Sequence, residues 1–135
     1  MSSSREDYLQ AIFRISKKKG YATNKEIAEY LNISKPSVTE MIKKLVDFNM
    51  VEVEKNKITL KEAGKKQARD VLSTHRLWEY FLENKLGLKG DVVHHQADLL
   101  EHITSDELKD ALNKYLGYPS LSPKGNIIYE NEKKS

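Results

Sequence analysis

The sequence contains no cysteine, and this absence excludes disulfide bonds and thiolate metal sites. No apolar run approaches the roughly 18 residues of a membrane-spanning helix. The opening MSSSREDYLQ also lacks the apolar core of a signal peptide. Catalytic signals are missing too, because the chain has no H-E-x-x-H motif, no glycine-rich phosphate loop and no setting for a nucleophile. We therefore expect a cytoplasmic protein that is not an enzyme.

The 135 residues suit one domain, or one small domain with an extension, and 39% of them are hydrophobic. Their charge is unevenly distributed. The first 66 residues carry 14 lysines and arginines against 9 acidic residues, whereas the remainder carries 9 against 11. A basic first half favours a polyanionic partner, and an acidic second half that holds every histidine favours a bound cation.

The first 60 residues predict three short helices followed by a β-hairpin. Ser4 caps the first helix and Gly20 ends it, Thr23 and Glu26 form a capping box that opens the second, and Pro36 stands in the first turn of the third. Apolar and polar residues then alternate around EKNK, which indicates a hairpin. This order is typical of a winged helix-turn-helix, in which the second helix of the pair enters the major groove of DNA.

Side chains suited to DNA occupy the third predicted helix and the hairpin tip. Short hydroxyl groups and a proline can approach base edges and phosphates, a glutamate can read the cytosine amino group, and lysines neutralise phosphates. Winged helices also mediate protein contacts, so a protein partner stays open at this point. The expected DNA-binding residues are Ser34, Lys35, Pro36, Ser37, Thr39, Glu40, Lys43, Lys44, Lys55 and Lys57.

The second half predicts a long helix that ends at Gly87 and two shorter helices. The tail that follows contains two of the three prolines, which predicts an extended or mobile segment. One of the shorter helices is DVVHHQADLLEHI, residues 91–103. At 3.6 residues per turn its potential metal ligands fall within an arc of about 100°, while Val92, Leu99 and Ile103 form a separate apolar face. The ligands on that arc are His94, Asp98, Glu101 and His102.

Other candidate ligands lie on two further helices. His75 and Glu79 are four residues apart on the long helix, and Asp7 precedes Gln10 by almost one turn on the first. Nitrogen and oxygen ligands without a thiolate point to Mn, Fe, Co, Ni or Zn. Two alternatives stay open: a winged-helix regulator that senses an organic ligand, with a merely solvated His/Asp/Glu face, and a DNA-binding protein that needs no metal.

Five motifs resemble the diphtheria toxin repressor family, especially its short manganese-transport-regulator branch: EDYLQAIF, IAEYLNISKPSVTEMIKKL, ITLKEAG, HRLWEYFL and HHQADLLEHITSDELKDAL. The resemblance implies a mainly α protein, with a winged helix-turn-helix DNA-binding domain over residues 1–62. An all-helical metal-binding and dimerisation domain with an extended tail would follow over residues 63–135. No SH3-like domain is expected, because the chain ends soon after SPKGNII.

The resemblance also implies a function. Family members are cytoplasmic homodimers in which divalent iron or manganese acts as a co-repressor and promotes binding to operators of metal-uptake genes. A metal ion that joins the first, fourth and fifth helices would fix the DNA-binding half relative to the dimerising half. The dimer is expected to use apolar residues of the last three helices, such as Leu86, Leu88, Leu99 and Leu100.

Two positions distinguish the branches of this family. Asp7 occupies a ligand position that holds Met in the iron branch and Asp in the manganese branch. Asp98 occupies a position that holds Cys in the iron branch and Glu in the manganese branch, and Gln10 stands where the manganese branch has Glu. Oxygen in place of sulfur at positions 7 and 98 favours a hard cation. We therefore expect Mn²⁺ as the effector, with Fe²⁺ second.

The remaining ligand candidates match positions that bind metal in this family, so the resemblance implies that they are ligands too. Glu101 and His102 match a Glu-His pair that both branches share, and His75 matches a shared histidine. Glu79 and His94 match additional ligands of the iron branch's second site. Two ions per subunit would then be held, one by Asp7, Asp98, Glu101 and His102 and the other by His75, Glu79 and His94.

Overall fold

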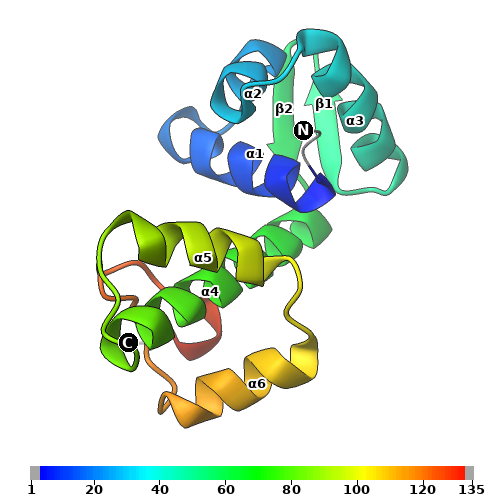
Figure 1. The fold of residues 1–135 in the computed structure, drawn as a ribbon. Coiled ribbons are helices and arrows are strands. Elements are labelled where there is room, and N and C mark those ends of the chain that lie inside the picture. Colours follow the sequence, from blue (N-terminus) through cyan, green and yellow to red (C-terminus); the bar gives the residue numbers. More distant parts are fainter. Residues whose placement is uncertain (1–3, 133–135) are drawn as a thin grey trace. The chain divides into compact units, whose positions relative to one another are not determined.

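A computed structural model describes residues 4–132 of the chain, and it is mainly helical, as predicted. The chain divides into two compact units, Met1–Arg69 and Asp70–Ser135, and the division lies inside the longest helix (Figure 1). No helix in the described range is long and apolar enough to cross a membrane. The elements are α1 (Arg5–Lys19), α2 (Asn24–Leu31), α3 (Lys35–Asp47), β1 (Val51–Glu54), β2 (Lys57–Leu60), α4 (Glu62–Asn84), α5 (Asp91–Glu101), α6 (Asp106–Tyr115) and the short 3₁₀ helix η1 (Tyr129–Asn131).

Side-chain caps place the starts of the first helices where the sequence predicted them. Ser4 accepts a hydrogen bond from the backbone of Asp7, whose carboxylate accepts one from the backbone of Ser4 at 3.0 Å. Thr23 and Glu26 form the same reciprocal box at the start of α2. Each cap satisfies backbone donors that a helix start leaves without partners, and is worth about 1 kcal/mol. Gly20 ends α1 at φ 88°, a left-handed conformation that costs glycine little.

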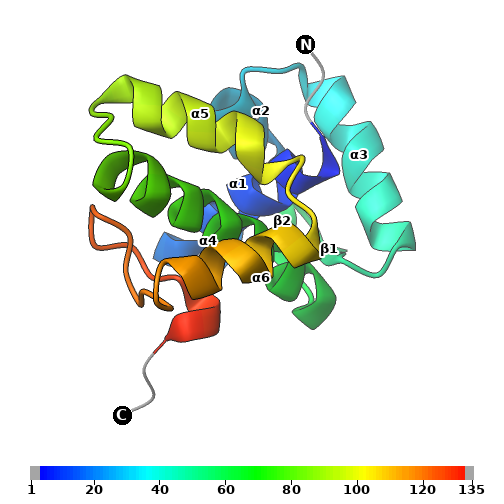
Figure 2. The same ribbon diagram turned by 60° about the horizontal axis from the view of Figure 1, so that its bottom comes forward.

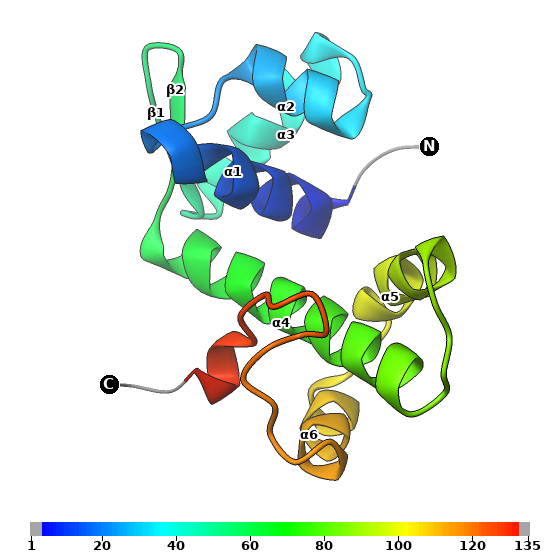
Figure 3. The same ribbon diagram turned by 90° about the vertical axis from the view of Figure 1, so that its left-hand side faces the viewer.

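The N-terminal unit has the architecture of a winged helix-turn-helix. Helices α1, α2 and α3 bury Leu9, Ile27 and Leu45 completely in one core. The β1–β2 hairpin is antiparallel (Figure 3). It adds Val51 and Ile58 to this core. Ala22 pairs with Ile58 through two backbone hydrogen bonds, which ties the segment before α2 to the hairpin. The start of α2 is thereby held near the wing.

The C-terminal unit is arranged around the second part of α4 (Figure 2). On one side Leu82 of α4 packs against Val93 and Ala97 of α5. A separate cluster joins Leu77 of α4 to α6 and the tail, through Leu112, Leu116 and Ile128. Trp78 and Phe81 contact both clusters and connect them. Helix α5 therefore rests on a well-packed helix, which is a suitable support for ligands that must not move.

The prediction of an extended or mobile tail needs correction for the described part of that segment. Residues 118–132 fold back onto α4, where the Arg76 guanidinium donates to the carbonyl of Ile127 at 2.7 Å and Ser73 accepts from the backbone of Tyr129 at 3.0 Å. Two amides, Asn113 and Asn131, also bond reciprocally between α6 and η1. Proline content indicates where helices stop, but it does not show whether the chain beyond them is packed.

Replacement of Ile128 by alanine tests this packing. Ile128 is fully buried against α4 and α6, so the variant should lose about 2–4 kcal/mol of unfolding free energy, as large-to-small core substitutions do. Chemical denaturation measures the loss. Ile127→Ala is the matched control, because Ile127 is 37% exposed and should cost far less. Equal, small losses in the two variants would contradict a packed tail.

Candidate metal centre and candidate nucleic-acid interface

Five predicted ligands gather where α5 packs on α4. His75 and Glu79 lie one turn apart on α4, and His94, Asp98 and Glu101 follow one face of α5. Two groups in the C-terminal unit each bring one ligand atom per residue within 4.8 Å of the others: His75, Glu79 and His94, and His75, Asp98 and Glu101. The two groups share His75, so the predicted ligands form one connected cluster in which this imidazole is central.

The two nitrogens of His75 face opposite sets of carboxylates. Nδ1 donates to Oε1 of Glu101 at 2.6 Å and lies 3.3 Å from a carboxylate oxygen of Asp98. Nε2 lies 3.3 Å from Oε2 of Glu79. His94 completes the cluster, with its two nitrogens 3.6 Å from Glu79 and 3.4 Å from Asp98. A neutral imidazole offers one lone pair, so His75 can serve as ligand to only one of the two groups at a time.

The cluster has a buried side and an open side. His75, Glu79 and Glu101 have relative exposures of 3%, 6% and 6%. The side chains of His94 and Asp98 are about half exposed, at 51% and 52%. Buried carboxylates cost free energy unless a positive charge pairs with them. Because His94 and Asp98 are half exposed, an ion from solvent can reach the buried carboxylates of Glu79 and Glu101.

Electrostatics show how the cluster compensates its negative charge without a metal. Burial alone lowers the pKa of His75, but hydrogen bonds and charge interactions with Glu101 and Glu79 outweigh burial and raise the pKa to about 9. Burial raises the pKa of Glu79, and the contacts with His75 and His94 outweigh it and lower that pKa overall. At neutral pH, His75 is therefore a cation between two buried carboxylates, and a metal ion must replace its proton.

This proton makes metal binding dependent on pH. A raised pKa stabilises the metal-free fold fully below the ordinary value near 6.5, and this stabilisation is lost as the pH rises through about 9. Between these values, binding through His75 should release about one proton, and metal affinity should rise with pH. Calorimetry at pH 7.5 in buffers of different ionisation enthalpy measures the release. An enthalpy that is identical in all buffers would contradict a protonated His75.

The other predicted ligands are placed less decisively. His102 is the C-terminal cap of α5, and its Nε2 lies 3.6 Å from Oε2 of Glu101. Asp7 and Gln10 lie on α1 in the N-terminal unit, and Asp7 takes part in the cap of that helix. Their participation in a metal site stays a prediction. His95 is not one of the predicted ligands, and it is exposed and belongs to neither group in the C-terminal unit.

The apolar residues predicted to share one face of the helix at residues 91–103 are exposed in the subunit. Val92, Leu99 and Ile103 have exposures of 52%, 54% and 76%, whereas Val93 and Ala97 fill the core. The leucines expected at a dimer contact also separate into two kinds. Leu86 and Leu99 are exposed, but Leu88 and Leu100 pack in the core against α4. Periodicity identifies an apolar face without showing what covers it.

All ten predicted DNA-binding residues are exposed, and they lie at the start of α3, along α3 or on the hairpin. Ser34 caps α3, accepting a hydrogen bond from the backbone of Ser37. Lys55 lies in the hairpin turn, and the Lys57 ammonium lies 5.0 Å from the ring centre of Tyr21. The remaining seven, all exposed on α3, are Lys35, Pro36, Ser37, Thr39, Glu40, Lys43 and Lys44.

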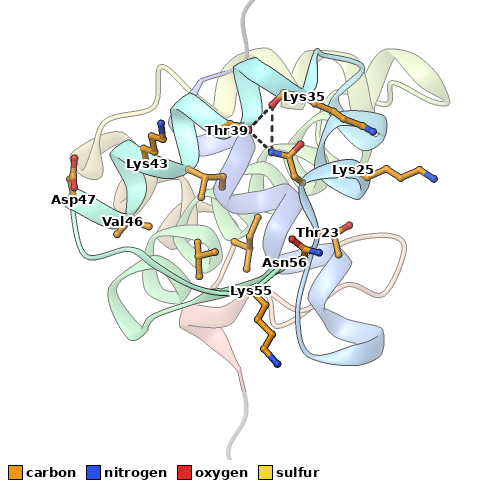
Figure 4. Close-up of a pocket in the computed structure, with 13 residues that line it drawn as sticks. Thr23, Lys25, Lys35, Thr39, Lys43, Val46, Asp47, Lys55 and Asn56 are labelled. Atoms are coloured by element: carbon orange, nitrogen blue, oxygen red, sulfur yellow. Dashed lines mark hydrogen bonds between the residues drawn. The ribbon is translucent and has the colours of Figure 1, made fainter.

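A hollow of about 940 Å³ separates α3 from the hairpin and the start of α2 (Figure 4). Its rim carries Lys25, Lys35, Lys43 and Lys55, and its apolar lining includes Val46 and Val53. A positively charged groove beside a helix that can enter the major groove suits a DNA backbone. Sequence reasoning did not single out Asn24, Lys25 or Asn56, which also line the hollow, because only the fold brings α2 beside the wing.

Comparisons with known proteins match both halves of the chain. Residues 1–58 match the model "Iron dependent repressor, N-terminal DNA binding domain", and residues 61–130 match "Iron dependent repressor, metal binding and dimerisation domain". An HTH-type transcriptional regulator of Methanocaldococcus jannaschii is 36% identical over 118 residues, which cover 86% of this chain and 94% of that one.

Longer relatives are similar over part of their length. The diphtheria toxin repressor of Corynebacterium jeikeium is 32% identical over 124 residues, which cover 91% of this chain and 52% of the relative. A solved manganese-dependent transcriptional repressor in complex with manganese is 33% identical, with a TM-score of 0.85, and the match covers 93% of this chain and 58% of that one. The chain therefore spans about half the length of these relatives.

Proposed function

The chain belongs to the iron-dependent repressor family, and on that premise we propose that it is a repressor whose DNA binding is switched on by Mn²⁺. Fe²⁺ is the second candidate. The metal would promote binding of a homodimer to operators of metal-uptake genes. The observation that carries this proposal is the cluster centred on His75. In this cluster the buried carboxylates of Glu79 and Glu101 contact the His75 imidazole, and half-exposed ligands face solvent.

The chemistry of the cluster favours a hard divalent ion. Glu79, Asp98 and Glu101 supply oxygen, His75 and His94 supply nitrogen, and the sequence has no thiolate to attract softer ions. Carboxylate ligands suit Mn²⁺, although affinity alone does not exclude Zn²⁺. The structure of the related repressor with manganese supports the same ion.

Two arrangements are compatible with a His75 that binds one ion at a time. If each subunit holds two ions, His75, Glu79 and His94 would hold one. The other would be held by Asp98, Glu101 and His102 with Asp7. The shared position of His75 also allows a single ion held by His75, Asp98 and Glu101. The stoichiometry of Mn²⁺ binding separates these arrangements.

The two domains are proposed to have separate functions. Residues 1–62 would read DNA through α3 and the wing, and residues 63–135 would bind metal and form the dimer. The exposed apolar residues Val92 and Leu99 of α5, together with Ile103 just after the helix, support a contact between two copies of this unit. Two reading helices must then match half-sites about 34 Å apart, and metal binding would select that spacing from a wider ensemble.

Titration of chelated protein with Mn²⁺ in a calorimeter tests this function, and two adjacent histidines give a matched pair of variants. His94→Ala should weaken binding, on the order of 10- to 100-fold, whereas His95→Ala should bind as the wild type does. Both histidines are exposed on α5, so neither variant should disturb the fold. Lack of saturable Mn²⁺ binding by the wild type would favour the alternative of an organic effector or no effector. Equal affinities of the two variants would show that the ligands are wrongly assigned.

A further inference from the structure

The hydroxyl group of Thr39 is turned into a small hydrogen-bond network on the flank of α3. Its oxygen lies 3.1 Å from the carbonyl of Lys35, to which it donates, and accepts from Nδ2 of Asn24 at 2.9 Å. The same Nδ2 lies 3.5 Å from the Lys35 carbonyl (Figure 4). Asn24 is the first residue of α2, so this network links the start of α2 to the helix proposed to read DNA.

The single proton of this hydroxyl is used inside the network in either orientation of the Asn24 amide. With Nδ2 toward Thr39, the proton goes to the Lys35 carbonyl, because an amino group cannot accept it. With the amide reversed, the proton would go to Oδ1 of Asn24. In both cases Thr39 has no proton left to donate to a base or a phosphate.

The neighbouring hydroxyl groups on α3 differ from Thr39. The hydroxyl groups of Ser34 and Ser37 share one hydrogen bond of 2.8 Å, and Oγ of Ser34 also accepts from the Ser37 backbone. One proton of this pair lies between the two oxygens, and the other has no acceptor among residues 4–132. Unlike Thr39, the Ser34–Ser37 pair therefore keeps a proton that it can donate to DNA.

Thr39 nevertheless lies at an exposed position, one turn beyond Lys35 and next to Glu40. With its hydroxyl occupied, the part of the side chain that is left for a ligand is its methyl group. In the major groove, the one apolar group on a base edge is the C5 methyl of thymine. Residues of the first turns of a reading helix are those that contact base edges.

We propose that Thr39 recognises a thymine methyl group with its own methyl, and that Asn24 is the positioning residue that holds Thr39 in this orientation. The inference rests on the proposed DNA-binding function. Thr39 would then contact a base through an apolar group. Asn24, which lies on the other helix of the pair, would affect sequence specificity without contacting a base.

The test uses a DNA duplex that wild-type protein with Mn²⁺ selects from a random pool. Each thymine is replaced in turn by deoxyuridine, which lacks only the methyl group. At one position or more, wild-type affinity should fall about fourfold, the factor that one buried methyl group is worth. Thr39→Ser keeps the hydroxyl but lacks the methyl group, so at this position it should bind the thymine duplex and the deoxyuridine duplex equally. Thr39→Val keeps a methyl group and should still discriminate between thymine and deoxyuridine.

Two results would overturn the inference. One is an equal response of the wild type and Thr39→Ser to every deoxyuridine, which is expected if Thr39 contacts only a sugar or phosphate. The other is loss of discrimination in Thr39→Val, which would mean that the hydroxyl is required. If wild-type protein selects no duplex at all, DNA binding itself is contradicted, and the inference fails with it.

A second pair of variants isolates Asn24. Asn24→Ala leaves the Thr23–Glu26 capping box in place, and it should reduce discrimination between thymine and deoxyuridine toward equality. Lys25→Ala is the matched control on the next residue. It should weaken binding of all duplexes alike and lower the salt dependence, because a lysine that neutralises a phosphate contributes equally to every sequence. Full discrimination by Asn24→Ala would show that Asn24 does not position Thr39.

Discussion

Replacement of His75 by alanine is expected to abolish metal-dependent DNA binding. His75 belongs to both ligand groups of the C-terminal unit, so neither group keeps three ligands after its loss. Mn²⁺ affinity should fall on the order of 100-fold or more, at least as much as when groups that support a ligand are removed. The metal-free protein should also lose about 3–5 kcal/mol of stability, because Glu79 and Glu101 stay buried without their counter-charge.

Two further variants keep this prediction testable if His75→Ala does not fold. His75→Gln retains hydrogen-bond donors for the buried carboxylates but is a poor metal ligand, and it should fold while failing to bind Mn²⁺ tightly. His95→Ala should behave as the wild type in both respects. Calorimetry with Mn²⁺ and thermal unfolding provide the two readouts. A folded His75→Gln protein with unchanged Mn²⁺ stoichiometry and affinity would contradict the central role of His75.

Replacement of Leu99 by aspartate should separate the dimer and weaken operator binding on the order of 100-fold. Leu99 lies on α5 among exposed apolar residues, with Val92 on the same helix and Ile103 just after its end. Burial of such side chains at an interface contributes about 1.5–3 kcal/mol each, and two facing aspartates would instead repel. A single subunit can engage only one half-site, so operator affinity falls with the loss of the dimer.

Leu108→Asp is the matched control for this prediction. Leu108 is 46% exposed and lies on α6, outside the α5 face, and the substitution introduces the same charge. Sedimentation at micromolar concentration should show a monomer for Leu99→Asp and a dimer for Leu108→Asp and the wild type. The reverse result would move the interface to α6, and dimers in all three proteins would show that Leu99 is not at the contact.

Local chemistry determined which parts of the fold could be predicted from the sequence. Ser4, Thr23 and Ser34 cap their helices within three residues of chain, so composition and spacing alone predict the helix starts. The wing was predictable for the same reason, because β1 and β2 are neighbours in sequence. The ligand face of α5 follows from helical spacing, which places His94, Asp98 and Glu101 on one side.

Features that depend on distant segments could not be predicted in this way. Val92 and Val93 are adjacent and chemically identical, and only the position of α4 makes one exposed and the other buried. The packed tail depends on Ser73 and Arg76, more than fifty residues upstream of their partners. The network of Asn24 and Thr39 likewise needs α2 and α3 to be placed side by side.

The central claim is that a metal ion bound at the His75 cluster switches on DNA binding. Fluorescence anisotropy of a labelled duplex, selected in the presence of Mn²⁺, tests it most directly when chelated protein is compared with Mn²⁺-loaded protein at fixed ionic strength. We predict affinity on the order of 10- to 100-fold higher with Mn²⁺, and no such gain for His75→Gln. Equal affinity of wild-type protein with and without Mn²⁺ would contradict it.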